Sequence, residues 1–430
     1  MRRVTPGVSS LMRKFLALLG TLAIAGCATV EPHVMPTPAM FKDPRLDFTK
    51  ADSAALKSTR LPVFYATTRA PAKPGNEGHY VNSQGEGTTL GVAQVRLGEP
   101  GWTWDELIAS DLASSVDKVR HGAVESVEEI AKLQGGSEPT EGERRFIAAI
   151  DTQLTRTNNK EVVMYLHGYR VEFDEVAVQM GSFAHFLGHS AMVTFQWPTG
   201  MMFWNYVTDC PRAERYIPDI ENTIALLART KATKVNLLAY SCGSPLMAAA
   251  LAKLRARHPE ENHEQLQNRY RIGNVIFAAS DVDLKTFARE YVPPMTDLAQ
   301  QLIVYASQND KALGFSTLIA GASRLGRPDI NDLSTEELER LAGEKGLQFI
   351  DVSNVRGAHE MGGMKGHGYW YANDWISTDI TLSLRHPVPP EKRCLVNKGN
   401  RKRVWVMKDD YPKCVADEFL EAFPGLRRTP

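Results

Sequence analysis

The most informative part of the sequence is Val235-Asn236-Leu237-Leu238-Ala239-Tyr240-Ser241-Cys242-Gly243, which leads into an Ala- and Leu-rich segment. Its first six residues have the composition of a buried strand, and the segment after Gly243 has the pattern of a helix. The small residues Ala239 and Gly243 let the two backbones approach each other while Ser241 is held in a tight, strained turn. A serine in this position can serve as a nucleophile. The alternative is a serine that only caps the helix.

Short apolar, β-branched or aromatic runs alternate with helical patterns on both sides of this stretch. The predicted strands cover residues 61–66, 91–97, 162–167, 192–197, 235–240, 274–279, 302–306 and 348–352. The predicted helices cover residues 171–187, 212–229, 244–257 and 333–342. The last six strands are nearly all apolar, which is typical of parallel strands covered on both faces. We therefore predict an α/β fold within residues 61–385: a mostly parallel, doubly wound sheet of about eight strands with helices on both faces.

Two polar segments interrupt this alternation. Residues 101–159 are Glu-rich, contain helical patches such as 126–133, and separate the early strands from the core of the predicted sheet. Residues 314–346 separate two of the later strands. Each segment is either a lid over a site or a surface excursion, and the sequence favours neither.

The strand at 162–167 ends in the pair His167-Gly168, which is followed by Tyr169. In acyl-transfer enzymes with this architecture, the loop after such a strand supplies one backbone N–H to the developing oxyanion, and the residue after the serine supplies the other. We therefore predict an oxyanion hole formed by the backbones of Tyr169 and Cys242. His167 is interpreted as a residue that orders this loop rather than as a base.

A serine hydroxyl needs a base, and the base needs a carboxylate to orient it. The chain offers both in the order Ser, Asp, His that α/β-hydrolases use. Asp310 lies just beyond the strand at 302–306, and His367 lies in the Gly-rich loop after the last strand. The predicted catalytic triad is therefore Ser241, Asp310 and His367.

Two alternatives remain for this triad. Asp281 follows the strand at 274–279 and is the alternative acid, although an Asp at the start of a helical pattern is also a common helix cap. His359 lies in the same loop as His367 and is the alternative base.

The motifs that carry the triad belong to a longer ordered set. The set consists of Phe64-Tyr65-Ala66-Thr67-Thr68-Arg69, His167-Gly168-Tyr169, Gln196-Trp197-Pro198, Ala239-Tyr240-Ser241-Cys242-Gly243, Ala279-Ser280-Asp281-Val282-Asp283, Asn309-Asp310-Lys311-Ala312-Leu313, Arg324-Leu325-Gly326 and Gly366-His367-Gly368-Tyr369. In this order, over residues 61–384, the motifs resemble those of a bacterial α/β-hydrolase family of the esterase/lipase superfamily, largely uncharacterised biochemically. The resemblance implies a serine hydrolase fold with Ser241, Asp310 and His367 as its triad.

The sequence departs from that family beside the serine. Tyr240 and Cys242 stand where the family usually has His and Met. Both positions can contribute backbone and packing, so the departure bears on substrate preference more than on the reaction class.

The predicted activity is hydrolysis of a carboxylic ester or other acyl substrate through a covalent acyl-serine intermediate. This chemistry needs no metal and no organic cofactor. Amide hydrolysis and acyl transfer use the same machinery and remain alternatives. A further alternative belongs to another class, a lipid-anchored binding or envelope-assembly protein that keeps the fold without turnover.

An apolar cluster follows the strand at 192–197 and consists of Trp197, Met201, Met202, Phe203, Trp204 and Tyr206. In open α/β sheets, ligands bind in the crevice beyond the carboxyl ends of the strands. The cluster is either an acyl pocket or ordinary core and loop packing, because Met and aromatic residues are common in cores.

The N-terminus has the pattern of an export signal. Basic residues precede the short apolar run 15–24, which is too short to span a bilayer. The following Ala25-Gly26-Cys27 resembles the bacterial lipobox, which implies removal of residues 1–26 and attachment of acyl chains such as palmitate to Cys27. Met12 begins a more typical signal than Met1, so either residue can be the true start.

The expected location follows from this signal. Residues 27–60 contain several prolines and little apolar periodicity, and we predict that they form an extended tether. Position 28 is Ala rather than the Asp that often retains lipoproteins at the inner membrane. We therefore expect a lipid-anchored protein of the cell envelope, at the outer membrane and facing the periplasm.

The remaining cysteines fit an oxidising compartment. Cys394 and Cys414 lie 20 residues apart within the C-terminal tail, residues 386–430. A disulfide between them would close the tail into a loop, and two free thiols are the alternative. Cys210 and Cys242 lack metal-ligand spacing with nearby His, so we predict no metal site.

Composition excludes some classes of protein. The 430 residues are 43% hydrophobic and 23% charged, as in ordinary globular proteins. The precursor has 50 basic and 50 acidic residues, but the four basic residues of 1–26 leave 46 against 50 from Cys27 onward, a net charge of −4. Without a basic excess, no nucleic-acid partner is expected. The predicted partners are an acyl substrate and, through the lipid, a membrane.

Overall fold

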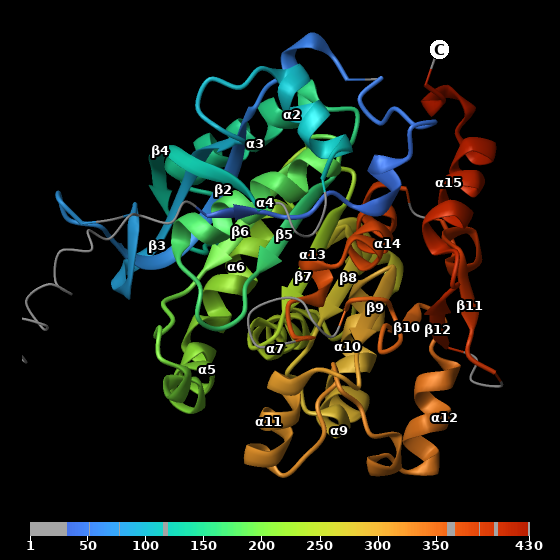
Figure 1. The fold of residues 1–430 in the computed structure, drawn as a ribbon. Helices are drawn as coiled ribbons and strands as arrows, with labels where there is room; N and C mark the ends of the chain where they lie inside the picture. The colour runs from blue at the N-terminus through green and yellow to red at the C-terminus, as the bar shows by residue number, and fades with distance from the viewer. Residues whose placement is uncertain are drawn as a thin grey trace, which may run out of the picture. The chain divides into compact units, whose positions relative to one another are not determined.

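The computed structural model describes residues 32–50, 52–76, 78–114, 119–358, 366–386, 388–399 and 403–428. Within these residues, the central feature is a sheet of twelve strands (Figure 1). The strand order is β1-β4-β3-β2-β6-β5-β7-β8-β9-β10-β12-β11. The strands are β1 (His33–Val34), β2 (Arg60–Pro71), β3 (Tyr80–Leu97), β4 (Arg120–Lys132), β5 (Val162–Leu166), β6 (Ala191–Gln196), β7 (Val235–Tyr240), β8 (Ile272–Ala278), β9 (Gln301–Ala306), β10 (Leu347–Asp351), β11 (Leu395–Asn397) and β12 (Val404–Met407). Neighbours from β2 to β12 in this order are parallel, and antiparallel pairs extend the sheet at both edges.

Helices connect most of the parallel strands. The α-helices are α2 (Trp104–Leu112), α3 (Glu141–Arg156), α4 (Phe173–Phe186), α5 (Tyr206–Arg212), α6 (Ile217–Leu227), α7 (Gly243–Ala256), α8 (His263–Tyr270), α9 (Leu284–Thr286), α10 (Val292–Leu298), α11 (Lys311–Ala320), α12 (Thr335–Gly343), α13 (Tyr369–Ala372), α14 (Asp374–Arg385) and α15 (Tyr411–Ala422). The shorter 3-10 or π elements are η1 (Ala39–Lys42), η2 (Ala54–Leu56), η3 (Phe203–Asn205), η4 (Ala213–Tyr216), η5 (Phe287–Tyr291), η6 (Ile330–Asp332), η8 (Pro390–Arg393) and η9 (Pro424–Leu426). Local sequence sets some of the starts: Thr140 with Glu143 forms a capping box at α3, and Ser334 with Glu337 forms one at α12.

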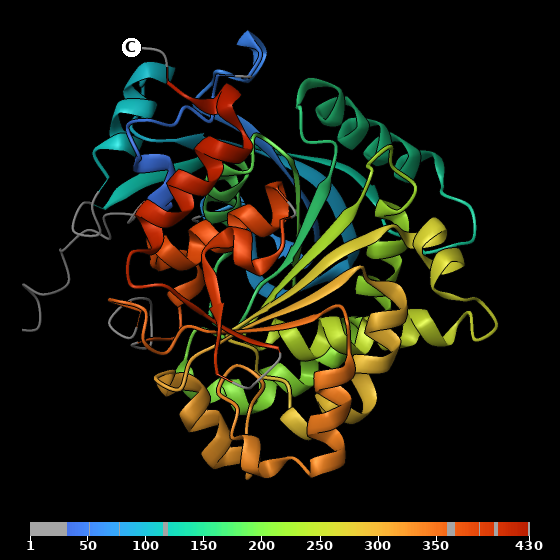
Figure 2. The same cartoon turned by 90° about the vertical axis from the view of Figure 1, so that its right-hand side faces the viewer.

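The sheet has an apolar core on each face. Along β5, Val163 and Tyr165 belong to one core cluster, and Val162, Met164 and Leu166 belong to the other. This alternation is the two-residue period of a strand that is covered on both sides. Helices α4, α14 and α15 pack in the first cluster, and α3, α6, α7 and α10 pack in the second (Figure 2).

The prediction of a mostly parallel α/β sheet with helices on both faces is confirmed. All eight predicted strands are present, as β2, β3 and β5 to β10. The sheet has four further strands within the described residues, β1, β4, β11 and β12. The predicted helix over 126–133 is wrong, since residues 126–132 belong to β4, in which Val124 and Val127 pack on the core and the polar residues between them are exposed.

The structure corrects the prediction of a loosely packed tether at 27–60, as far as residues 32–60 are described. β1 pairs with β4, and Met40, Leu46 and Phe48 are buried in the core beside α14 and α15. Three apolar residues spread over nine positions form no continuous helical or strand pattern, so the sequence did not predict their burial. Residues 1–31, which include the predicted signal and Cys27, lie outside the described residues.

Two other segments differ from their predicted roles. Residues 101–159 supply β4 and α3 to the sheet and its cover, so this segment is neither a lid nor an excursion. In the C-terminal tail, 386–430, β12 pairs with β10 in parallel and α15 packs on the core. The predicted Cys394–Cys414 disulfide is confirmed, with the two Cα atoms 6.0 Å apart.

Among the described residues, no helix is both long and apolar enough to cross a bilayer.

Candidate active site

Ser241 lies in the turn between β7 and α7, at the carboxyl end of the parallel strands. Its φ of 51° falls in the left-handed region, which costs a serine energy. The neighbouring glycines make the turn possible: a Cβ on Gly243 would clash with the carbonyl oxygen of His167, and a Cβ on Gly168 would press on the Cβ of Ser241. The turn therefore has the geometry of a nucleophile elbow.

Two hydrogen bonds join Asp310, His367 and Ser241. His367 Nδ1 lies 2.8 Å from Asp310 Oδ2, and His367 Nε2 lies 2.7 Å from Ser241 Oγ. Because an ionised carboxylate can only accept, Nδ1 carries the ring proton and Nε2 accepts the proton of the Ser241 hydroxyl. Asp310 is fully buried, and its other oxygen accepts from the backbone N–H of Leu313 at 2.9 Å, which fixes the carboxylate at the start of α11. The structure brings the three predicted residues together.

Tyr369 anchors the segment that carries His367. Its buried hydroxyl donates to the carbonyl of Tyr305 at 2.8 Å and accepts from the backbone N–H of Ala279 at 2.9 Å. The Tyr240 ring lies 5.1 Å from the His367 ring. The imidazole is therefore held from β8, β9 and the elbow. Tyr369 ends the motif Gly366-His367-Gly368-Tyr369, but its anchoring role was not predicted from the sequence. The alternative base, His359, lies outside the described residues.

His167 orders the loop that follows β5. Its Nε2 accepts from the backbone N–H of Trp197 at 3.1 Å, so Nδ1 donates to the carbonyl of Gly168 at 2.7 Å. In a trans peptide the C=O and N–H point in opposite directions, so the N–H of Tyr169 points away from His167. Burial, and then the charge of Arg69, lower the pKa of His167 to about 3, so its ring stays neutral.

The backbone N–H groups predicted to form the oxyanion hole are available. Among the described residues, neither the N–H of Tyr169 nor that of Cys242 makes a hydrogen bond. Cys242 precedes the first turn of α7, where backbone N–H groups have no partner within the helix. Tyr169 and Ser241 line the same pocket.

Arg69 supports this loop from β2. Its side chain is 1% exposed, and Nη2 donates to the carbonyl of Val171 at 3.0 Å. Burial lowers the pKa of Arg69 to about 9. The sequence motif at 64–69 contained this residue, but a single arginine in a strand gave no indication of its role.

Asp281, the alternative acid, holds different partners. Its Oδ1 accepts from the hydroxyl of Ser316 in α11 at 2.6 Å, and its Oδ2 accepts from the hydroxyl of Tyr206 in α5. Arg324 Nε lies 3.4 Å from the same carboxylate. Burial and the Asp281 charge raise the pKa of Tyr206 well above 10, so the phenol stays protonated as a donor. Among the described residues, no hydrogen bond or ion pair joins Asp281 to an imidazole.

A second disulfide, Cys210–Cys242, ties α5 to the residue after the nucleophile, with the Cα atoms 5.9 Å apart. From the sequence, these cysteines were considered only as metal ligands, and their pairing was not predicted. A separation of 32 residues does not by itself indicate that two cysteines form a disulfide. Within the described residues, no cluster of three His, Cys, Asp or Glu side chains could hold a metal ion.

A pocket of about 390 Å³ opens at Ser241. Its lining comes from the loop after β5, from α4, α5, α11 and α13, and from the elbow: Tyr169, Arg170, Val171, Glu175, Tyr206, Tyr240, Ser241, Ala312, Leu313, Phe315, His367 and Tyr371. The apolar cluster predicted at 197–206 divides between roles. Trp197 is fully buried and stacks on His167, Tyr206 lines the pocket, and Met202 and Trp204 are exposed.

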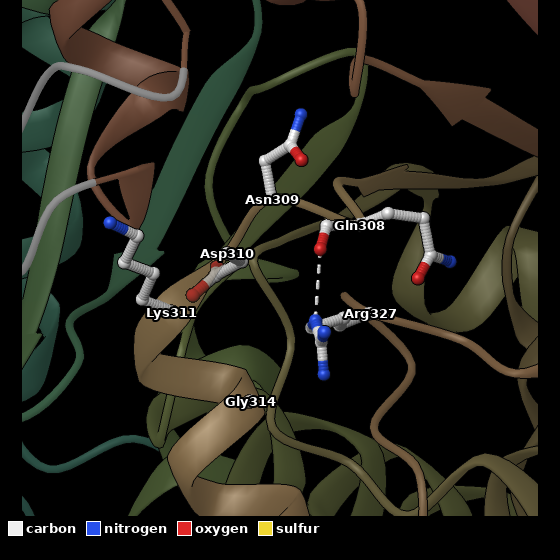
Figure 3. Close-up of a pocket in the computed structure, with 6 residues that line it drawn as sticks. All are labelled: Gln308, Asn309, Asp310, Lys311, Gly314 and Arg327. Carbon is white, nitrogen blue, oxygen red and sulfur yellow. Dashed lines mark hydrogen bonds between the residues drawn. The ribbon is translucent and has the colours of Figure 1, made fainter.

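A larger cavity, of about 590 Å³, lies beside Asp310 and is lined by Gln308, Asn309, Lys311, Gly314 and Arg327 as well (Figure 3). Arg327 donates to the carbonyl of Gln308 at 2.9 Å, and Lys311 points away from it. The side chains do not converge on a common point, and Ser241 does not line this cavity. The chemistry of the site therefore belongs to the smaller pocket.

Comparison with known proteins gives one family. A family model described as "Alpha/beta hydrolase of unknown function (DUF900)" matches residues 143–382, which is more than half of the chain and runs from α3 to α14. The matched region contains Ser241, Asp310, His367 and Asp281. No curated protein matches the chain.

Proposed function

The chain belongs to this family of α/β-hydrolases, and we propose that it is a serine hydrolase acting on carboxylic esters or related acyl substrates. The observation that carries the proposal is the pair of hydrogen bonds from Asp310 through His367 to Ser241. A protein that had kept only the fold for binding would not need a serine, an imidazole and a carboxylate aligned in this way. The alignment therefore favours turnover over the non-catalytic alternative.

In the proposed mechanism, Ser241 Oγ attacks the carbonyl carbon of the substrate while its proton moves to His367 Nε2. The tetrahedral oxyanion accepts hydrogen bonds from the N–H groups of Tyr169 and Cys242, each worth about 10²- to 10³-fold in rate. The imidazolium, held by Asp310, then gives its proton to the leaving oxygen as the C–O bond breaks. Water attacks the acyl-serine with His367 as base, which releases the acid and restores the serine.

Labelling with a fluorophosphonate probe tests this proposal. The probe should react with the purified protein, and Ser241→Ala should abolish labelling together with ester hydrolysis. Ser244→Ala is the matched control, because this buried serine is the second residue of α7 and its hydroxyl has no hydrogen-bond partner among the described residues. Labelling that persists in Ser241→Ala would contradict the assignment of the nucleophile.

The location of this activity is a separate proposal. It rests on the lipobox-like sequence at Cys27 and places the hydrolase at the cell envelope, held by lipid.

A further inference from the structure

Exposed apolar side chains are concentrated in the two segments that contribute Tyr206 and Phe315 to the Ser241 pocket. Seven of the eleven large hydrophobic residues that are exposed in the described part of the chain lie in two short segments. We call them the apolar rim: Met201, Met202, Trp204, Val207, Phe315, Leu318 and Ile319. Leu318 is 80% exposed, so its side chain makes little contact with the rest of the chain.

The two segments that form the apolar rim also lack charge. Residues 197–208 and 312–323 contain no Asp, Glu, Lys or Arg, in a chain in which 23% of residues are charged. Surface segments of this length normally carry charges that keep the protein soluble. Their absence at this place indicates contact with an uncharged, apolar ligand.

The apolar rim is continuous with the wall of the pocket. On α11, Phe315 lines the pocket, and Leu318 and Ile319 are its neighbours one turn further along the helix. On the other side, Tyr206 lines the pocket, and the Tyr169 hydroxyl donates to the carbonyl of Met202 at 2.7 Å.

A hydrogen bond also joins the two helices that carry rim residues. The Tyr206 hydroxyl of α5 lies 2.9 Å from Ser316 Oγ of α11, so the two helices are linked beside the pocket. Arg170 and Glu175 also line the pocket, but Tyr206, Leu313 and Phe315 give it a wall that forms an apolar path from Ser241 to the exposed rim.

We propose that this path binds the acyl chain of the substrate, and that the preferred substrates are esters of medium or long fatty acids. The proposal rests on the proposed serine hydrolase function and assigns its substrate class. An acyl chain makes only apolar contacts, which is what the rim offers. A peptide in the same place would bury backbone N–H and C=O groups against side chains that cannot satisfy them.

Hydrolysis of p-nitrophenyl acetate, butyrate, octanoate and laurate, each below the concentration at which it self-associates, tests the proposal. The wild-type protein should have the highest kcat/KM on octanoate or laurate. The ratio of kcat/KM for laurate to that for acetate should fall about five-fold in Phe315→Ala and in Leu318→Ser, since each buried methylene is worth about 0.8 kcal/mol. Leu338→Ser on α12 is the matched control, an exposed leucine outside the rim, and should leave the ratio unchanged.

The outcomes separate this inference from the proposed function. An equal ratio in wild type and both rim variants, or a wild-type preference for acetate, would overturn the acyl-chain site while leaving a serine hydrolase. A loss of ratio in Leu338→Ser as large as in Leu318→Ser would also overturn it. No hydrolysis of any ester, together with no fluorophosphonate labelling, would overturn the proposed function and the inference with it.

Discussion

Asp310 and Asp281 are two buried carboxylates that follow adjacent parallel strands, β9 and β8, and Asp310 reaches Ser241 through His367. The backbone N–H of Asp281 even donates to the carbonyl of Ser241, at 3.3 Å. Their partners nevertheless differ: Asp310 accepts from an imidazole, whereas Asp281 accepts from the hydroxyls of Tyr206 and Ser316.

The difference follows from the segments that reach each carboxylate. The segment after β10 brings His367 to Asp310, and α5 and α11 bring their hydroxyls to Asp281. The role of a carboxylate that follows a strand is thus not determined by that position alone. We infer that Asp310 orients the base, and that Asp281 holds together the two helices that form the mouth of the pocket.

The largest effect should come from Asp310→Asn. The amide retains an oxygen that can cap α11, so the fold should persist. The amide of this variant would no longer hold His367 in the required tautomer or stabilise the positive charge of the imidazolium. We therefore expect kcat to fall by about 10³- to 10⁴-fold. Steady-state hydrolysis of an ester and the rate of fluorophosphonate labelling measure this loss.

The same substitution at Asp281 serves as the comparison for Asp310→Asn. If Asp281→Asn lowered kcat as severely while Asp310→Asn did not, the two assignments would be reversed. Circular dichroism and thermal unfolding of both variants would establish that folded proteins are being compared.

A smaller effect is expected from Asp281→Asn itself. Tyr206 and Ser316 would lose hydrogen bonds to a charged acceptor, each worth about 1.5 to 3 kcal/mol, and the mouth would loosen. We expect kcat/KM to fall about ten-fold, mostly through KM, with kcat within about three-fold of the wild type. Tyr206→Phe removes one of the same bonds, so its effect should be smaller in the Asp281→Asn background than in the wild type. A fall confined to kcat would contradict a role in the pocket wall.

The sequence was sufficient to predict the parallel core of the fold. The strands β5 to β10 are short apolar runs between helices, and burial on both faces leaves this pattern directly in the sequence. The strands at the edges of the sheet were harder to predict from the sequence. β4 alternates polar and apolar residues irregularly, and β12 and β11 are short, so their place in the sheet depends on distant partners.

At the site, the order of Ser241, Asp310 and His367 along the sequence led to the prediction that they form a triad. The fold joins them by hydrogen bonds through His367. The residues that support them were not predictable in the same way. Tyr369 acts through a hydroxyl bound to the backbone of Tyr305 in β9 and of Ala279 just after β8, and Cys210 acts through a partner 32 residues away. Such contacts exist only after folding, and no local periodicity encodes them.

The smallest of the expected effects on activity concerns the disulfides. Cys210→Ser and Cys414→Ser each open one disulfide, and loop-closure entropy predicts that each costs about 3 to 4 kcal/mol of unfolding free energy. Only the first lies at the site, since Cys242 adjoins Ser241 and Cys210 lies on α5. We expect Cys210→Ser to lower kcat/KM about three-fold, since the hydrogen bond between Tyr206 and Asp281 still holds α5. Cys414→Ser should leave kcat/KM unchanged despite a similar loss in denaturation midpoint.

Combining Cys210→Ser with each aspartate variant tests whether Asp281 and Asp310 have the different roles inferred above. If Asp281 and the Cys210–Cys242 disulfide both restrain α5, each masks the loss of the other, and removing both should cost more than the two single losses together. Cys210→Ser should therefore lower kcat/KM about ten-fold in an Asp281→Asn protein, against about three-fold alone, which corresponds to a coupling of about 0.7 kcal/mol. In an Asp310→Asn protein the same substitution should keep its three-fold effect on the residual activity, because Asp310 acts through His367 and not through α5. Equal coupling to both aspartates would mean that the disulfide acts on the elbow itself.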